Sequence, residues 1–210
     1  MKKIFDVLMS IVLAVSFLTA CGKPAGNLST PSGGGKPKIG FILGTEQEER
    51  YQRDKKSFIE AAEAEGVEVI FLSCNNDELV QANAVDSILS QGVSVIVIQP
   101  VNSDNAGVYV DKAHARGVRI IAYDRMINHK DLDFYAGQDS YSVGKSQAIA
   151  AIEWMKTHGG LGKVVICSGQ QGHSVAEAIT KANIDVLKEA CASIALQQYH
   201  DAWGTDQALN

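Results

Sequence analysis

Cysteine is scarce in this chain, with four residues in 210: Cys21, Cys74, Cys167 and Cys191. Their spacing matches none of the paired patterns that hold zinc, and an odd number remains once Cys21 is set apart. Cys74 and Cys167 fall at the ends of predicted strands, and Cys191 falls near the end of a predicted helix. We therefore expect buried free thiols and no metal site.

Basic tracts are also missing. The chain has 19 Lys and Arg against 24 Asp and Glu, a net charge of −5. No basic cluster is interleaved with aromatic residues in the way that binding to a phosphate backbone requires. Nucleic-acid binding is therefore not expected. A composition of 46% hydrophobic and 20% charged residues indicates a globular chain, with room for one large domain or two small ones.

The sequence signatures of catalysis are absent. Residues 137–146 end in Gly-Lys-Ser, but six residues separate Gly137 from Gly144, and a phosphate-binding loop has fewer. We expect Ser140 to cap a helix that contains Gly144. Residues 169–174 do not form a nucleophile elbow, and no paired-histidine motif occurs. Neither an enzyme nor a cofactor is predicted.

The first residues predict an export signal. A basic start at Lys2 and Lys3 precedes an apolar run that is too short to span a bilayer comfortably. Residues 18–21, Leu-Thr-Ala-Cys, resemble the bacterial lipobox, which implies a signal peptide over 1–20 and lipidation of Cys21. The alternative is an ordinary secretory signal with an incidental cysteine. Residues 21–37, rich in Gly, Ser and Pro, predict a flexible tether that holds an extracytoplasmic domain at the membrane.

From residue 38 the sequence alternates between strand and helix patterns. Gly66, Gly92 and Gly117 each lie where a helix end needs a left-handed residue, and each precedes an apolar run. The expected strands are 38–43, 67–72, 93–98, 118–122 and 133–136. The expected helices are 48–65, 77–90 (with Leu79, Val80, Ala84, Ile88 and Leu89 on its inner face) and one from Ser103 or Asp104 to 116. Such alternation predicts an α/β fold with a doubly wound parallel sheet. We assign 38–137 to a first lobe.

Residues 138–210 predict part of a second lobe. Helices are expected over 140–158 and 174–190, and strands over 163–167 and 194–199. The sequence stops after the second of these strands, and two strands make a poor sheet. We expect an incomplete second lobe with exposed apolar strand edges.

An acid and a base, Asp124 and Arg125, follow the fourth predicted strand of the first lobe. Open α/β sheets bind their ligands at the carboxyl ends of strands. A carboxylate accepts hydrogen bonds and a guanidinium donates them in a fixed fork, so the pair suits neighbouring hydroxyl groups.

Three stretches follow a wider pattern. They are residues 49–54 (Glu-Arg-Tyr-Gln-Arg-Asp), residues 122–128 (Ala-Tyr-Asp-Arg-Met-Ile-Asn) with 133–135, and residues 198–203 (Gln-Tyr-His-Asp-Ala-Trp). Together they resemble the sugar receptors of the bacterial periplasmic-binding-protein family, and the xylose-type members most of all. The resemblance implies two α/β lobes that close on one sugar.

The resemblance also implies the site residues. Arg50, Asp124 and Arg125 would hydrogen-bond sugar hydroxyls from the first lobe, with Tyr51 against the sugar and Trp203 offering an aromatic face from the second lobe. Each also has a structural alternative: Arg50 as a solvated residue at a helix start, and Tyr51 and Trp203 as packing residues.

One loop departs from the family. Where relatives carry Asp-Asn-Asn, this chain has His173, Ser174 and Val175. His173 and Ser174 can still hydrogen-bond, whereas Val175 cannot, so the departure bears on which sugar is bound.

The resemblance implies capture of a monosaccharide, a pentose of the D-xylose type, for an ABC permease. The alternative is a co-receptor that switches a membrane histidine kinase when sugar is bound. The effector-binding core of a transcription regulator is disfavoured, because an export leader is present and an N-terminal helix-turn-helix is not.

Overall fold

The computed structural model describes residues 36–159, 163–190 and 196–200. The signal peptide, Cys21 and Trp203 lie outside these residues. Five parallel strands form the first sheet in the order β2-β1-β3-β4-β5. They are β1 (Lys38–Leu43), β2 (Glu68–Ser73), β3 (Val95–Ile98), β4 (Arg119–Tyr123) and β5 (Phe134–Ala136). The predicted doubly wound α/β arrangement is confirmed.

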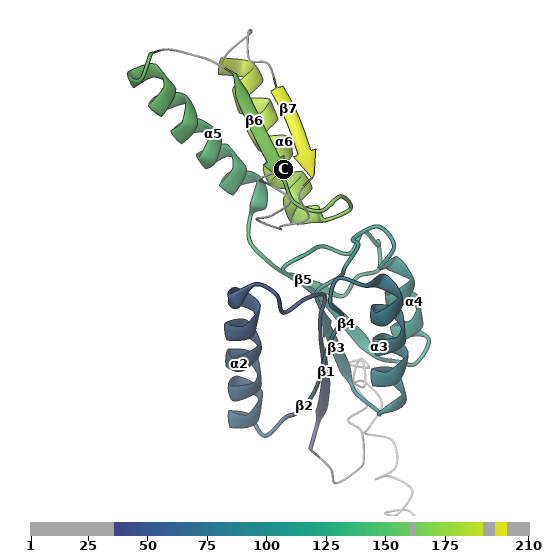
Figure 1. Ribbon diagram of the computed structural model, residues 1–210. Helices are drawn as coiled ribbons and strands as arrows, with labels where there is room; N and C mark the ends of the chain where they lie inside the picture. The colour runs from purple at the N-terminus through teal and green to yellow at the C-terminus, as the bar shows by residue number, and fades with distance from the viewer. Residues whose placement is uncertain (1–35, 160–162, 191–195, 201–210) are drawn as a thin grey trace, which may run out of the picture. The chain divides into compact units, whose positions relative to one another are not determined.

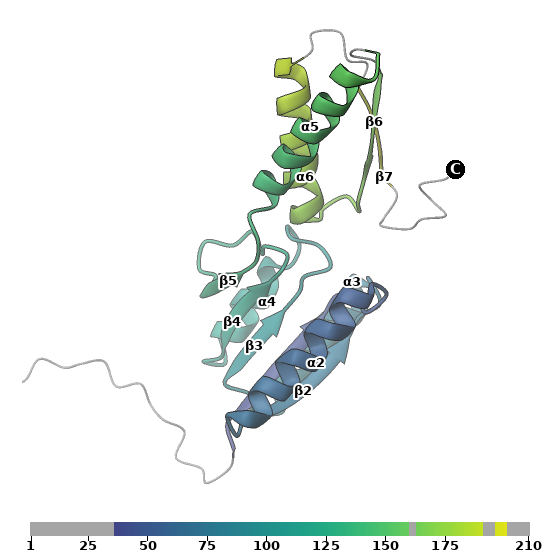
Figure 2. The same ribbon diagram turned by 90° about the vertical axis from the view of Figure 1, so that its left-hand side faces the viewer.

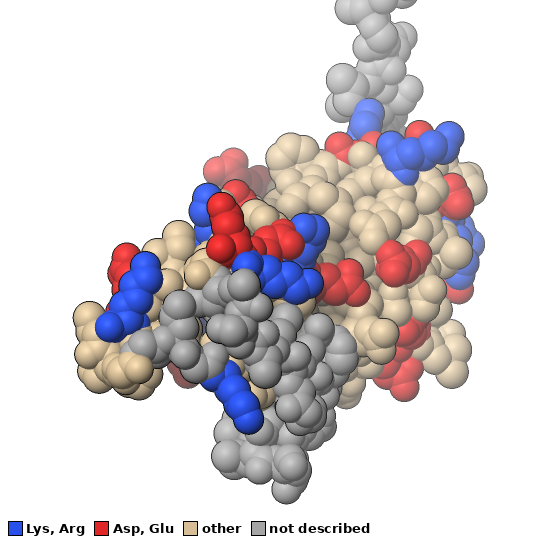
Figure 3. All heavy atoms as spheres, turned by 90° about the horizontal axis from the view of Figure 1, so that it is seen from above, with Lys and Arg blue, Asp and Glu red and all other residues tan. Residues whose placement is uncertain are grey.

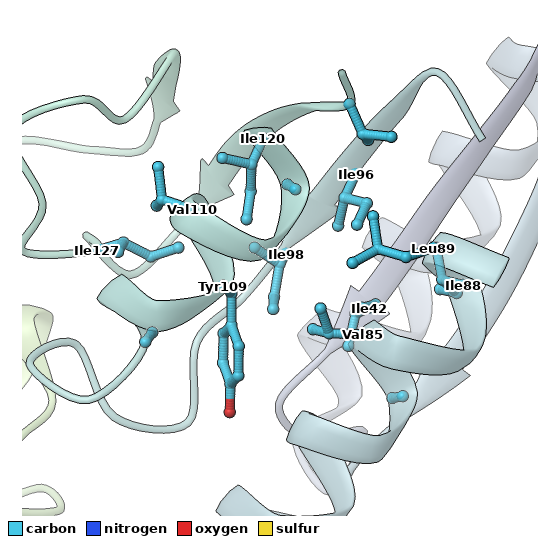
Figure 4. Close-up of a cluster of buried hydrophobic side chains, with 14 of the residues drawn as sticks. Ile42, Val85, Ile88, Leu89, Ile96, Ile98, Tyr109, Val110, Ile120 and Ile127 are labelled. Carbon is cyan, nitrogen blue, oxygen red and sulfur yellow. The ribbon is translucent and has the colours of Figure 1, made fainter. Parts of the chain in front are cut away.

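Helices cover both faces of this sheet (Figure 1): α2 (Glu49–Ala64) lies on one side, and α3 (Glu78–Ser90) and α4 (Gly107–His114) lie on the other. The larger core lies under α3 and α4, where isoleucine and valine side chains from strands and helices interdigitate (Figure 4). The smaller core lies under α2, where the rings of Phe41 and Phe58 pack with centroids 4.3 Å apart. Strands buried on both faces explain the continuous apolar runs in the sequence.

The start of α4 was predicted too early. The helix begins at Gly107, and residues 103–106 form a turn instead. The side-chain oxygen of Asn102 accepts the backbone N–H groups of Asp104 at 3.0 Å and Asn105 at 3.2 Å. These local hydrogen bonds compete with helical backbone hydrogen bonds, so the helix begins later in the sequence.

The buried face of α3 was also partly wrong. Asp77 caps the helix as expected, accepting from Leu79 N at 2.8 Å and Val80 N at 2.9 Å, but Leu79 and Val80 themselves are 72% and 43% exposed. Gln81 is fully buried in their place. Its amide donates to the Gln99 carbonyl at 2.9 Å and accepts from the Val101 N–H at 2.9 Å. A polar side chain satisfied in this way can occupy the core.

A second, two-stranded parallel sheet follows, made of β6 (Val164–Ser168) and β7 (Leu196–His200). Helices α5 (Ser140–Thr157) and α6 (Ser174–Ala190) lie together on one face of it (Figure 2).

Asp139 rather than Ser140 caps α5, because its side chain accepts the Ser142 N–H at 3.0 Å. Gly144 is needed for packing, since a Cβ there would lie 2.3 Å from the Ile179 carbonyl oxygen.

The outer face of β6 is open. Val164 and Ile166 pack toward the helices, while Val165 is 57% exposed and Cys167 is exposed beside it. The expectation of a buried thiol is therefore confirmed for Cys74 and wrong for Cys167, and Cys191 lies outside the described residues. The alternation along β6 follows from helices covering only one face.

Charged side chains of both signs are interspersed on the face seen in Figure 3. Several form exposed ion pairs, such as Lys112 with Asp86 at 2.9 Å. The expectation that the chain does not bind nucleic acid stays a prediction. Over the described ranges, no helix combines the length and apolar character needed to cross a membrane.

Candidate functional site

The candidate site lies where the strand order of the first sheet reverses. β1 is hydrogen-bonded to β2 on one side and to β3 on the other. Open parallel sheets bind ligands at such a switch point, outside the carboxyl ends of the strands. Gly44, Gln99 and Asp124 follow β1, β3 and β4 there, and the first turn of α2 brings Arg50 and Tyr51 to the same edge.

The turn after β4 fixes the position of Asp124. The backbone of Asp124 is left-handed, with φ of 61°, a conformation uncommon outside Gly, Asn and Asp. Three hydrogen bonds hold it: Arg125 N to Tyr123 O at 2.6 Å, Asp124 N to Ala136 O at 2.8 Å, and the Tyr135 hydroxyl to Asp124 O at 2.9 Å. Such strain is of order 1–3 kcal/mol and persists where neighbours hold it in place.

The Asp124 carboxylate is the centre of the site. It is only 3% exposed and accepts hydrogen bonds from Arg50, from the Tyr51 hydroxyl at 2.9 Å and from the Gln99 amide at 3.3 Å. A carboxylate offers about four acceptor positions, so room remains for a ligand hydroxyl. Burial and the Asp124 charge raise the pKa of Tyr51 to about 12, so its hydroxyl remains a donor at neutral pH.

Arg50 is held from two sides. Asp124 accepts from its Nη2, and Asp54 lies 3.5 Å from its Nε. Asp54 in turn accepts from the Tyr123 hydroxyl at 2.5 Å. Burial alone would lower the pKa of Arg50, but the Asp124 carboxylate raises it on balance, so the guanidinium stays charged.

Arg125 is the largest fully buried side chain in the described part of the protein, at 1% exposed. Its Nη1 donates to the Pro100 carbonyl at 3.3 Å, while Nε and Nη2 have no hydrogen-bond partner among the described residues. Buried donors of a charged group cost free energy when unsatisfied. The arrangement therefore favours a ligand or water that accepts from Arg125.

The loop before α6 brings His173 to the site. The loop is joined to the segments that follow β3 and β4 by hydrogen bonds from Ser103 N to Gly172 O at 3.0 Å, from Ser174 N to Ser103 Oγ at 3.3 Å and from Met126 N to Ser174 Oγ at 2.8 Å. Burial and the nearby Arg125 charge lower the pKa of His173 to about 3, so its imidazole is neutral at pH 7.

A cavity of about 240 Å³ lies at the meeting point of these elements. Its lining residues are Glu48, Arg50, Tyr51, Asp124, His173 and Val175. A cavity of similar volume lies against α6, but its charged residues, Glu177 and Lys181, are exposed. We therefore place the candidate site at the first cavity. Within the ranges described, no cluster of His, Cys, Asp or Glu could hold a metal ion.

The structure thus brings Arg50, Tyr51, Asp124, Arg125 and His173 together, while Trp203 lies outside the described residues. Tyr51 acts through its hydroxyl on Asp124, a role that the sequence alone did not indicate.

Gln99 was missed as a site residue. Its Oε1 accepts the Gly44 N–H at 3.0 Å while its amide donates to Asp124. Its position directly after β3, at the same sheet edge, could have identified it.

Comparison with known proteins places these features in a family. A family model described as "Periplasmic binding protein domain" matches residues 39–210. The D-xylose-binding periplasmic protein of Escherichia coli (strain K12) is 31% identical over 176 residues, covering 82% of this chain and 52% of that protein. The xylitol-binding protein of Mycolicibacterium smegmatis is 29% identical over 194 residues, covering 92% and 53%.

A solved structure gives the same result. The ABC transporter solute-binding protein of Clostridium phytofermentans with bound β-D-glucose superposes with a TM-score of 0.74 at 25% identity, covering 81% of this chain and 57% of that one. The chain spans about half the length of the curated relatives it matches. The doubly wound sheet, the polar cluster at its switch point and these matches agree, and the chain belongs to the periplasmic-binding-protein family, related to the D-xylose-binding protein.

Proposed function

We propose that this protein binds a neutral monosaccharide, a pentose of the D-xylose type, at the cavity beside Asp124. The observation that carries the proposal is the buried Asp124 carboxylate, which is flanked by charged and neutral donors and has acceptor capacity left. Sugar hydroxyls both donate and accept, so they match a site that holds a carboxylate and guanidinium groups together. Relatives named for xylose and xylitol support a polyhydroxyl ligand.

The site residues have distinct roles in this proposal. Asp124 accepts from ligand hydroxyls, and Arg50 and Arg125 donate to them. Tyr51 positions the carboxylate, and neutral His173 contributes a hydrogen bond from the loop before α6. Trp203 offers an aromatic face, on the basis of the family resemblance. In this proposal the first lobe comprises residues 38–137, and residues 138–210 form part of the second. The sugar is bound when the two lobes close on it, without covalent chemistry.

Calorimetric titration of the purified full chain, kept in detergent, tests this function. The panel is D-xylose, D-ribose, L-arabinose and D-glucose. We expect saturable binding of at least one of them, with D-xylose the tightest. Absence of heat with all four sugars would refute the sugar-receptor proposal.

We also propose that the protein works outside the cytoplasm, anchored through a lipid on Cys21. Leu-Thr-Ala-Cys at residues 18–21 supports the anchor, and relatives named as periplasmic proteins support the compartment. Incorporation of a labelled fatty acid should be lost in Cys21→Ala. Labelling that persists in this variant would refute the anchor.

The partner we propose is an ABC permease to which the loaded protein hands its sugar. The alternative partner is a membrane histidine kinase. Deletion of the gene separates them: loss of sugar uptake supports transport, whereas intact uptake with loss of sugar-dependent kinase phosphorylation supports the co-receptor role.

A further inference from the structure

Glu48 lies at the start of α2, but its side chain does not cap that helix. It occupies the N-cap position with extended backbone, φ −83° and ψ 130°. An N-cap side chain of suitable length normally accepts a hydrogen bond from the first turn, but the Glu48 side chain makes no capping hydrogen bond. Glu48 is instead one of the residues that line the cavity beside Asp124.

The Glu48 carboxylate has an unused acceptor. Its Oε2 is buried and has no hydrogen-bond partner among the described residues. Leaving a buried charged acceptor unsatisfied is unfavourable by an amount comparable to a lost hydrogen bond to a charged group. Glu49, the next residue, is different: its side chain is 81% exposed and lies 3.5 Å from Arg53.

Glu48 also gives the site a net negative charge. Three carboxylates, those of Glu48, Asp124 and the Asp54 that pairs with Arg50, face the guanidinium groups of Arg50 and the adjacent Arg125, while His173 is neutral at pH 7. Without Glu48 these charges would balance, and the repulsion of an acidic ligand would be weaker. With Glu48 a second carboxylate can accept hydroxyl protons and repel an anion.

We propose that Glu48 is a specificity-determining ligand residue, accepting a hydroxyl of the bound sugar and selecting neutral polyhydroxyl ligands against sugar acids. This inference rests on the proposed function, because it concerns the same cavity.

The test compares Glu48→Gln with Glu49→Gln, which removes the same charge from the adjacent exposed position. Each full-chain protein is titrated calorimetrically with the tightest neutral sugar of the panel and with D-glucuronate. For Glu48→Gln we expect the affinity for the neutral sugar to fall roughly ten- to hundredfold, and the preference for it over D-glucuronate to shrink at least tenfold. Glu49→Gln should stay within about twofold of wild type on both ligands.

The outcomes separate this inference from the proposed function. If wild type binds a neutral sugar and Glu48→Gln matches Glu49→Gln on both ligands, the role of Glu48 is refuted and the sugar-receptor function stands. If wild type binds none of the sugars, both are refuted. Thermal unfolding serves as the folding control. Since the Glu48 side chain makes no capping bond, both variants should melt within a few degrees of wild type.

Discussion

Replacing Asp124 by Asn tests the centre of the site without disturbing the backbone. The residue sits at φ 61°, and Asn is among the few residues that adopt this conformation readily. Ala at the same position would add backbone strain, so the effect of that strain could not be told apart from the effect of losing the carboxylate. Asp124→Asn therefore changes charge and hydrogen bonding while the turn after β4 remains.

The magnitude follows from the contacts of the carboxylate. A hydrogen bond to a charged group contributes about 1.5–3 kcal/mol, so losing one to a ligand hydroxyl weakens binding roughly ten- to hundredfold. In the free protein, breaking a buried pair costs about 3–5 kcal/mol. The Arg50 side chain is 45% exposed, and solvent screening reduces the loss to about 2 kcal/mol. For a protein of this size we expect Tm to fall by about 4–8 °C.

The assays are calorimetric titration with the tightest neutral sugar and thermal unfolding followed by circular dichroism. Asp131→Asn is the matched control, because Asp131 is an exposed carboxylate paired only loosely with Lys130 at 3.5 Å. It should leave both affinity and Tm unchanged. If folded Asp124→Asn bound sugar within twofold of wild type, Asp124 could not be the main acceptor of the site.

Three further predictions concern other parts of the structure. Ser174→Ala removes the hydroxyl that accepts from the loop after β4, and titration should show a few-fold loss of affinity; unchanged affinity would show that this tie does not hold the loop. His173 has a pKa lowered to about 3 in the folded state against about 6.5 when unfolded, so its contribution to stability is full above pH 6.5 and is lost as pH falls toward 3. Denaturant unfolding at several pH values should show this loss, up to about 1.4 kcal/mol per pH unit, and His173→Gln should flatten that slope; an equal slope in both proteins would contradict the assignment. Gly144→Ala should unfold at a Tm several degrees lower, by about 2 kcal/mol or more, because its Cβ meets the Ile179 carbonyl oxygen at 2.3 Å; Gly107→Ala, whose nearest contact is 3.3 Å, should lose far less.

The sheet was predictable from sequence because its signals are local and repeated. Gly66, Gly92 and Gly117 all have positive φ near 70°, as an αL helix end requires, and each is followed by a strand of the parallel sheet. The errors arose where a side chain competes with the backbone pattern. The Asn102 side chain accepts a hydrogen bond from the backbone of the following turn, so α4 begins later than predicted. Gln81 occupies a core position that Leu79 and Val80 were expected to fill.

The site was predictable only in part. Asp124 and Arg125 stand at a strand end in the sequence, so their place at the sheet edge follows from topology. Their partners do not follow, because a hydrogen bond such as Gln99 to Asp124 joins residues 25 positions apart and depends on side-chain direction. The same applies to Glu48, which in sequence is one of several acidic residues before a helix and is distinguished only by its buried oxygen.

The residues around the cavity come from two places, the edge of the first sheet and the loop before α6. Asp124, Arg50 and Gln99 are held by hydrogen bonds that join α2 to the residues directly after β1, β3 and β4, so contacts within the protein position this part of the cavity. His173 and Val175 enter through the loop before α6, where one lining side chain is a neutral imidazole and the other is apolar. A ligand hydroxyl facing Val175 finds no partner there, and an unsatisfied buried hydroxyl is unfavourable by roughly 1–3 kcal/mol. If the proposed function holds, we expect this loop to discriminate sugars by hydroxyl position, while the residues at the edge of the first sheet bind the hydroxyls that the accepted sugars share.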